Sequence, residues 1–184
     1  MKLNSKLKVS DLGEFGLIKE IAKLIKIDNS VIYGIGDDSA VIRPNNDKFI
    51  LFTTDMLVED VHFSRKMNPY GIGHKALACN ISDIAAMGGI PKYAVISLGI
   101  PKDLSLSFVK YIYRGLTRIA NKFDINIVGG DTNASKKIII NVSLLGVVKK
   151  ENLITRSKAN IGDLIFVTGK LGRSFKSNKH LNFT

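Results

Sequence analysis

The sequence predicts an α/β (α+β) domain. Segments whose apolar residues recur at helical spacing alternate with short apolar runs of strand length. Glycine, proline, asparagine and aspartate residues separate these segments, as expected for turns between regular elements. A hydrophobic fraction of 45% with 23% charged residues is ordinary for a globular protein and provides enough apolar surface for a core.

The first half of the chain begins with an expected helix at residues 14–27, because its apolar residues recur at helical spacing while lysines occupy the other face. The glycine- and aspartate-rich residues 34–38 predict a turn or loop. Two strands are expected next, at residues 40–43 and 49–54, since the turn-forming residues 44–47 separate them.

The second half continues with a helix at residues 73–87, which the pair Gly88-Gly89 ends. A buried strand at 93–100 is closed by Pro101, and the most amphipathic helix of the chain follows at 108–120. Further apolar runs predict strands at the following positions: 125–128, 138–148 and, after a loop at 155–163, 164–168.

The chain carries a net charge of +11, with 27 Lys and Arg residues against 16 Asp and Glu. Such a charge can indicate nucleic-acid binding. However, the lysines are scattered, and no helix-turn-helix, zinc-finger or RNA-binding pattern is present. We therefore expect no nucleic-acid partner, and a basic surface could equally attract anionic small molecules such as nucleotides.

A cytoplasmic protein without a membrane anchor is expected. No stretch approaches the roughly 20 apolar residues of a membrane span, and the first residues lack the pattern of a signal peptide. The single cysteine, Cys79, excludes an internal disulfide and fits a reducing compartment. Because it lies inside a helical pattern, packing is a better interpretation of Cys79 than nucleophilic chemistry.

Acidic residues are the candidate functional groups, because each stands where a regular element meets a glycine or a turn. They are Asp37-Asp38, Asp55, Asp83 and Asp131. Asp55 and Asp131 are expected at the carboxyl ends of strands, where side chains from separate strands converge on a ligand. Mg²⁺ is commonly held by carboxylates together with phosphate oxygens, and Thr53 and Thr54 could complete its coordination.

Each aspartate also has a structural alternative. Asp38 could form a turn, Asp131 an Asx-turn, and Asp55 a helix cap. Asp83 differs, because it lies in an apolar helical run where an unpaired buried carboxylate would cost several kcal/mol. A cation or a hydrogen-bond network is needed at Asp83.

Paired or closely spaced glycines would let backbone amides approach phosphate oxygens, at Gly34-x-Gly36, Gly88-Gly89 and Gly129-Gly130. No P-loop, dinucleotide-binding or protein-kinase motif accompanies them. His62, seven residues after Asp55, is a candidate for a phosphate contact or a proton transfer. The residue types alone indicate a Mg²⁺–phosphate site whose reaction class they leave open.

Six segments carry a more specific signal: GEFGLI, GIGDDSAV, TTDMLVEDVHF, KALACNISDIAAMGGIPKYAVISLGIP, IVGGDT and LITRSKANIGDLIFVTGKLG. In this order they resemble the thiamine-monophosphate kinases. Aminoimidazole ribonucleotide synthetase, selenophosphate synthetase and a hydrogenase-maturation protein belong to the same superfamily. The resemblance implies a PurM-like N-terminal domain with a mixed or antiparallel sheet flanked by helices.

The resemblance also implies an activity, the ATP-dependent transfer of a phosphoryl group to thiamine monophosphate, which gives thiamine diphosphate. It implies that several Mg²⁺ ions are held by Asp38, Thr53, Thr54, Asp55, Asp83 and Asp131. It assigns ATP contacts to Tyr113, Gly130 and Arg156, and a substrate contact to His62. No covalent nucleophile is expected, because phosphoryl transfer is mostly positioning and charge neutralisation. The family pairs as homodimers through the sheet of this domain.

Two departures from the family pattern are present. Asp60 stands where the family has glycine, which adds a negative charge beside the site and affects a turn. Family members are also longer, so we expect residues 1–148 to form the N-terminal ATP- and Mg²⁺-binding and dimerisation domain. Residues 149–184 are then the incomplete start of a C-terminal domain.

Two alternative functions remain open. One is another ATP-using synthetase of the superfamily, although Cys79 in a helix does not fit the reactive residue expected of selenophosphate synthetase. The other is a non-catalytic module that binds nucleotide or dimerises.

Overall fold

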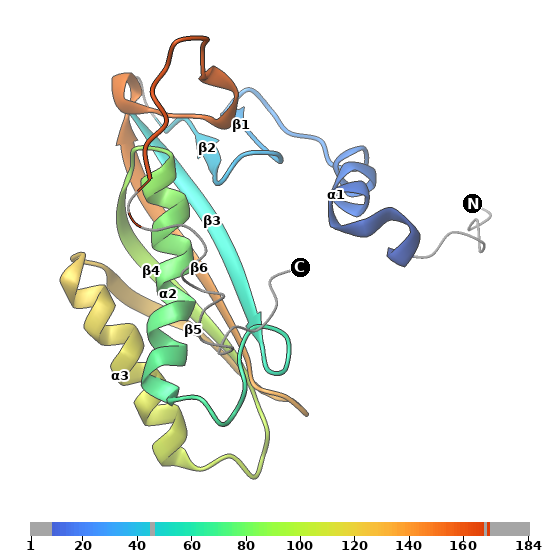
Figure 1. Cartoon of the computed structure of the whole chain (residues 1–184), viewed down its shortest axis with the longest axis vertical. Coiled ribbons are helices and arrows are strands. Elements are labelled where there is room, and N and C mark those ends of the chain that lie inside the picture. The colour runs from blue at the N-terminus through green and yellow to red at the C-terminus, as the bar shows by residue number, and fades with distance from the viewer. Residues whose placement is uncertain (1–8, 45–46, 168, 170–184) are drawn as a thin grey trace.

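The computed structural model of the 184-residue chain describes residues 9–44, 47–167 and 169. A mixed six-stranded sheet carries helices α2 (Pro69–Ala86) and α3 (Leu106–Lys122) on one face (Figure 1). Helix α1 (Val9–Ala22) lies apart from this body (Figure 1). The predicted α/β fold, with a mixed sheet flanked by helices, is confirmed.

The strands have the spatial order β1 (Val31–Tyr33), β2 (Ala40–Ile42), β3 (Lys48–Val58), β6 (Ile139–Lys149), β4 (Ile90–Ile100) and β5 (Asn126–Ala134). All neighbouring pairs are antiparallel except β4 and β5, which are parallel. A parallel pair needs a crossover connection, and α3 supplies it. Strand β6 pairs with both β3 and β4, so it joins the two halves of the sheet.

The core lies between the sheet and the two helices. Alternate side chains of β6, at Ile140, Val142 and Leu144, are completely buried on the helix side. Leu77 and Ile84 of α2 and Leu116 of α3 are buried from the other side, among other apolar residues. The opposite face of the sheet carries no helix among the described residues, and we call it the open face (Figure 1).

The helix starts were predicted too late. Helix α2 begins after the N-cap Asn68, whose side chain accepts a hydrogen bond from the Tyr70 N–H, and Pro69 occupies the first turn. Helix α3 begins after Ser105, whose hydroxyl accepts a bond from the Phe108 N–H. The cap residues, rather than the first apolar residue, set both boundaries.

Helix α1 differs from the prediction at both ends. It begins at Val9, has a break at Gly13, and ends at Ala22 instead of residue 27. Most of its side chains and those of residues 23–27 are exposed. Because a short helix gains most of its stability from packing, little holds the β-branched residues that follow Ala22 in a helix.

The strand predicted at residues 164–168 is wrong for its described part. Residues 164–167 form no strand, and their apolar side chains are exposed, while residue 168 lies outside the described residues. An apolar run becomes a strand only when another strand satisfies its backbone groups. Strand β1, which the sequence did not predict, has such a partner in β2.

The prediction that Asp55 and Asp131 stand at the ends of strands is also wrong. Strand β3 continues to Val58 because β6 pairs with it over its whole length. Strand β5 continues to Ala134 because β4 pairs with it that far. Both aspartates therefore lie inside strands, and the pleat decides which face of the sheet each one joins.

No helix in the described part of the chain combines the length and hydrophobicity needed to cross a membrane.

Helices α2 and α3 cross at backbone contact. A Cβ atom on Gly115 would lie 2.0 Å from the Tyr70 carbonyl oxygen, and one on Gly73 would lie 1.9 Å from the Ile112 carbonyl oxygen. Only glycine fits at these two positions, because any side chain would push the helices apart.

We expect Gly115→Ala to lower the free energy of unfolding by about 3 kcal/mol or more, since its methyl group meets rigid backbone. Urea denaturation measures this loss. Gly71→Ala is the matched control, because a Cβ atom there meets nothing within 4 Å. That substitution should leave stability unchanged or raise it by up to about 1 kcal/mol. Equal effects of the two substitutions would contradict the proposed crossing.

Candidate functional site

The pleat of β3 places two predicted ligands on the helix-covered face of the sheet. Thr53 and Asp55 alternate with exposed Phe52 and Met56, and they share their face with buried Leu51. The register confirms this placement, because Thr53 and Asp55 lie opposite residues 144 and 142 of β6, whose side chains are in the core.

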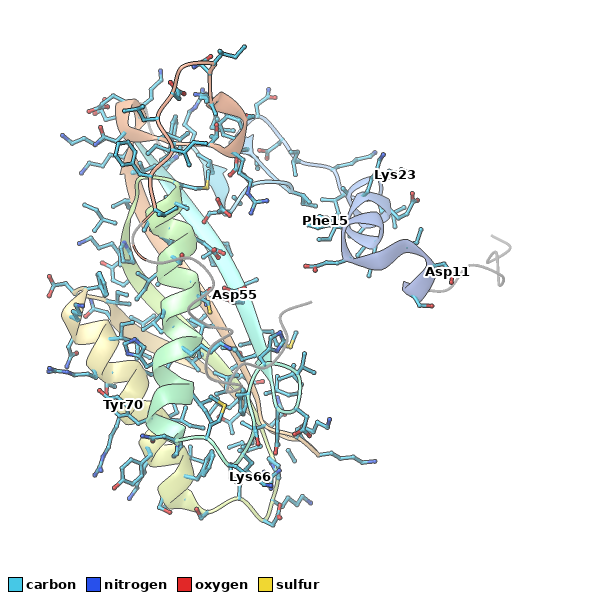
Figure 2. All side chains as sticks on the ribbon, viewed as in Figure 1. Asp11, Phe15, Lys23, Asp55, Lys66 and Tyr70 are labelled. Carbon is cyan, nitrogen blue, oxygen red and sulfur yellow. The ribbon has the colours of Figure 1, made fainter. Side chains whose placement is uncertain are left out.

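Helix α2 faces this part of β3 with a row of half-buried polar side chains. Lys75, Cys79 and Asp83 follow one another at intervals of four residues and so lie along one side of the helix. The Thr53 hydroxyl donates a 2.8 Å hydrogen bond to Asp83 Oδ2. Figure 2 shows Asp55 beside α2, near the middle of the helix. Strand β3 and helix α2 thus bring Thr53, Asp55 and Asp83 together.

Burial raises the pKa of both carboxyl groups. Desolvation is the largest cause for Asp55, and the positive potential of His62 opposes it. Desolvation is also the largest cause for Asp83, where the Thr53 hydrogen bond opposes it and the negative charges of Asp55 and Asp38 add to it. A neighbouring positive charge would therefore stabilise the ionised form of each carboxyl group.

Asp38 adjoins this pair from the loop before β2. Its carboxylate forms an ion pair with the Arg156 guanidinium, and the Arg156 N–H donates to Asp37 Oδ2 at 3.4 Å. The ion pair raises the pKa of Arg156. Two segments far apart in sequence therefore meet beside Asp83, and the sequence-predicted residues Asp38 and Arg156 lie together.

A groove of about 870 Å³ runs from this ion pair towards α1. Asp37, Asp38, Thr53 and Arg156 line its polar part, and apolar side chains of α1 and β2 line the rest. Its size and mixed lining are those of a small-molecule site. Two buried hydroxyls flank the ion pair, Ser39 Oγ and Thr155 Oγ1, and neither has a hydrogen-bond partner among the described residues.

His62 lies in the loop after β3. Its Nδ1 accepts a 3.0 Å hydrogen bond from the Val58 N–H, so in the neutral ring the proton is on Nε2. Buried Glu59 anchors the loop, since it accepts bonds from Arg65 and from the Ile138 N–H. The Arg65 hydrogen bonds are the largest cause that lowers the Glu59 pKa. Sequence reasoning missed this anchor, because Glu59 lies within the segment TTDMLVEDVHF but its partner Arg65 lies outside it.

Asp60 has a left-handed backbone, with φ of 66°. This conformation favours glycine and costs an aspartate about 1 kcal/mol. The turn is nevertheless formed, since the Asp60 N–H donates to the Phe63 carbonyl at 2.7 Å. The added carboxylate lies 3.4 Å from Lys137 Nζ, and both side chains are exposed.

Several predicted residues lie outside this cluster in the single chain. Thr54 is on the open face, where its hydroxyl contacts Ser143 Oγ at 3.0 Å, although it also lines the groove next to Thr53. Asp131 pairs in register with Ser97 on the open face of the sheet, and β6 and β4 separate its strand from β3. Tyr113 is half-buried on α3, and burial raises its pKa. Gly130 has a packing role, because a Cβ atom would lie 1.8 Å from the Ile96 carbonyl oxygen.

Cys79 lies in α2, as predicted, but its side chain is half-buried beside the cluster. Burial is the largest cause that raises the pKa of its thiol, and the negative charge of Asp55 adds to it. Lys75, one helical turn earlier, was not predicted as a site residue. The signal that could have identified it is its spacing of eight residues from Asp83 on the same side of a helix.

The residues of the cluster fit a cation that shares its ligands with a phosphate. No three His, Cys, Asp or Glu side chains among the described residues converge closely enough to hold a metal ion on their own. Mg²⁺ in nucleotide sites is typically held by one or two carboxylates, with water and phosphate oxygens completing the octahedron. Asp55 and Asp83, both half-buried and with a raised pKa, match that requirement.

The chain is similar to known kinases over nearly all of its length. It is 42% identical over 168 residues to the thiamine-monophosphate kinase of Aquifex aeolicus, covering 91% of this chain and 52% of that protein. It is 40% identical to the thiamine-monophosphate kinase of Bacillus subtilis, covering 89% of this chain and 51% of the relative. The chain thus spans about half the length of the curated relatives it matches.

A solved structure described as "AaThiL complexed with AMPPCP and TMP" has the same fold. The TM-score is 0.79 at 39% identity, and the match covers 87% of this chain and 49% of that one. Residues 36–148, more than half of the chain, match the family described as "AIR synthase related protein, N-terminal domain". The chain therefore belongs to the AIR synthase related protein family and contains its N-terminal domain.

Proposed function

We propose that the protein is a Mg²⁺-dependent kinase that transfers the γ-phosphoryl group of ATP to thiamine monophosphate. The pair of half-buried carboxylates, Asp55 and Asp83, is the observation that carries the proposal. Asp83 lies near the ion pair of Asp38 and Arg156, and it is hydrogen-bonded to Thr53, which lines a groove of nucleotide size. The 42% identity to a thiamine-monophosphate kinase supports this substrate over those of other ATP-using synthetases.

In this proposal Asp38, Thr53, Asp55 and Asp83 hold the cation, and Arg156 binds phosphate oxygens of ATP. When bound, Mg²⁺ would neutralise charge on the transferred phosphoryl group. A guanidinium suits phosphate because of its planar arrangement of donors. Arg156 is more than half exposed and bound to Asp38, so it can exchange a carboxylate for a phosphate with little loss of solvation.

His62 contacts the acceptor substrate in this scheme. The Val58 N–H fixes its ring orientation, and in the neutral ring the proton is on Nε2. A donor of this kind suits a phosphate oxygen, and no proton transfer by His62 is required, because positioning and charge neutralisation dominate this reaction.

A homodimer formed through the sheet is part of the proposal. The open face carries exposed apolar side chains, Phe52, Met56, Tyr93 and Val95. In the described part of the chain, β5 and residues 53–58 of β3 each have one edge without a strand partner. A second copy would cover this face and these edges.

The same dimer accounts for the ligands that one chain keeps apart. Tyr113, Gly130 and Asp131 lie on α3 and β5, at the edge of the sheet farther from Asp55. Placing β5 of one copy beside β3 of the other would bring Asp131, on the open face, to Thr54. We propose that each site takes Asp131 and its ATP contacts from the second copy.

We further propose that residues 1–148 are the nucleotide-binding and dimerisation domain and that residues 149–184 begin a second domain. The family match that ends at residue 148 supports this boundary.

Thiamine diphosphate formation tests the activity. The full protein, produced from its whole reading frame, should form this product from ATP, Mg²⁺ and thiamine monophosphate, with no product when EDTA is added. Chromatography with thiochrome fluorescence detects it. ATP binding without any product would instead favour a non-catalytic nucleotide-binding module and would refute the kinase proposal.

Stability in the presence of Mg²⁺ tests the carboxylates. The folded-state pKa of Asp83 is raised, so its contribution to stability is present at low pH and is lost as pH rises through the folded pKa. Without metal at pH 7, Asp83→Asn should therefore be at least as stable as the wild type. A Mg²⁺ concentration ten times the dissociation constant should stabilise the wild type by about 1.4 kcal/mol, and the variant much less.

Thermal unfolding with and without Mg²⁺ and ATP gives this comparison. Asp103→Asn is the control, because it removes a carboxylate from an exposed loop. An unchanged Mg²⁺ response in Asp83→Asn would exclude Asp83 as a ligand.

Sedimentation equilibrium tests the dimer. Tyr93→Glu places a charge among the apolar side chains of the open face and should shift the mass from two chains to one, with loss of metal-dependent ATP binding. Tyr111→Glu changes a similarly exposed aromatic residue on α3 and should leave the dimer intact. A Tyr93→Glu protein that remains dimeric would exclude the open face as the interface.

A further inference from the structure

We propose that Lys75 of α2, next to His62, binds the phosphate group of the acceptor substrate, thiamine monophosphate. This inference rests on the proposed function and identifies a residue that determines which acceptor the site takes. It follows from the position of Lys75, from its environment and from the order of charges along the site.

The position comes from the helix. Lys75 lies two helical turns before Asp83 on the same side of α2, about 12 Å away along the axis. Cys79 lies between them. Burial raises the pKa of its thiol most, the charges of Asp55 and Asp83 raise it further, and the charge of Lys75 lowers it. Lys75 therefore belongs to the same polar side of α2 as the carboxylates, at its opposite end.

The ammonium group of Lys75 is partly buried beside the loop that carries His62. Burial lowers the pKa of its ammonium group, and its Nζ donates a 2.9 Å hydrogen bond to the main-chain carbonyl of His62. A hydrogen bond to a carbonyl oxygen offsets part of the desolvation of an ammonium group. An ammonium can donate three hydrogen bonds, so bonds to this carbonyl and to a phosphate oxygen are compatible.

His62 links the two donors. Its carbonyl oxygen holds Lys75, and its ring is fixed by the bond from the Val58 N–H to Nδ1. The anchor formed by Glu59, Arg65 and the Ile138 N–H fixes the loop that carries His62. Lys75 and His62 thus form one rigid unit at the end of the site near Asp55, whose pKa responds to His62.

The charges along the site then have a functional order. Arg156 and Asp38 lie at one end, Asp83 and Asp55 in the middle, and His62 and Lys75 at the other end. Two phosphate groups that repel each other must meet at the carboxylates for the transfer. A cation at each end suits this requirement, with Arg156 on the nucleotide and Lys75 on the acceptor.

The test compares thiamine monophosphate with thiamine, which lacks the phosphate. In the full protein, Lys75→Met should weaken thiamine monophosphate binding by about 10- to 100-fold, as expected for a charge-assisted hydrogen bond. Thiamine affinity should not change. In the kinase assay the KM for thiamine monophosphate should rise by a similar factor, whereas the KM for ATP should not. Calorimetry measures binding in the absence of turnover.

Two further variants separate binding from structure. Lys75→Arg keeps the charge and should restore much of the affinity for thiamine monophosphate. Lys110→Met removes a lysine from the exposed side of α3 and should leave the affinity unchanged. Thermal unfolding identifies any variant that fails to fold. If Lys75→Met fails to fold, the ratio of thiamine monophosphate affinity to thiamine affinity in Lys75→Arg is compared with that of the wild type instead.

The inference is overturned if Lys75→Met weakens both ligands equally, if it matches Lys110→Met, or if the wild type binds thiamine monophosphate no better than thiamine. Failure of the proposed function looks different, because it gives no thiamine diphosphate while the wild type and its variants still differ in binding.

Discussion

The packing of α2 against the helix-covered face of β3 and β6 is the contact on which the rest of the molecule depends. Leu77 and Ile84 are completely buried in it, opposite Leu51 and Leu144. Because these apolar residues set the rotation of α2 about its axis, they also decide that Asp83 lies at the margin of the contact, within hydrogen-bond distance of Thr53. The candidate site is therefore a consequence of core packing, and any change that rotates α2 also separates its polar groups.

This arrangement has an electrostatic cost. Asp55 and Asp83 are partly withdrawn from water, each has a raised pKa, and the charge of Asp55 disfavours that of Asp83. A fold selected for stability alone would not bring these carboxylates together. Half-buried carboxylates with raised pKa values are candidate sites for a ligand that supplies positive charge. The surrounding apolar contacts of α2 supply the stability that offsets this local repulsion.

The sequence predicted the fold class and most of its elements, because period-2 and period-3.6 patterns follow directly from burial on one face. It did not predict which face of the sheet each aspartate joins. Extending β3 to Val58 and β5 to Ala134 depends on long-range pairing with β6 and β4, which no local pattern contains. The spacing of Lys75 from Asp83 is visible in the sequence, but its contact with the His62 carbonyl depends on how α2 packs beside the loop after β3. The separation of Asp131 from Asp55 is likewise a property of strand order, with two strands between them.

The edges of β3 and β5 that pair with no strand among the described residues have a consequence for the handling of this protein. An edge with open backbone donors and acceptors, next to apolar residues such as Met56 and Val95, can add a strand from any other chain. Specific and non-specific association then compete for the same backbone groups. Conditions that dissociate the proposed dimer would favour irregular aggregates, because they would expose these edges before the core itself unfolds. Low protein concentration would favour dissociation of the proposed dimer, and high concentration would favour non-specific strand pairing. Solubility on storage would therefore be lost at both extremes of concentration.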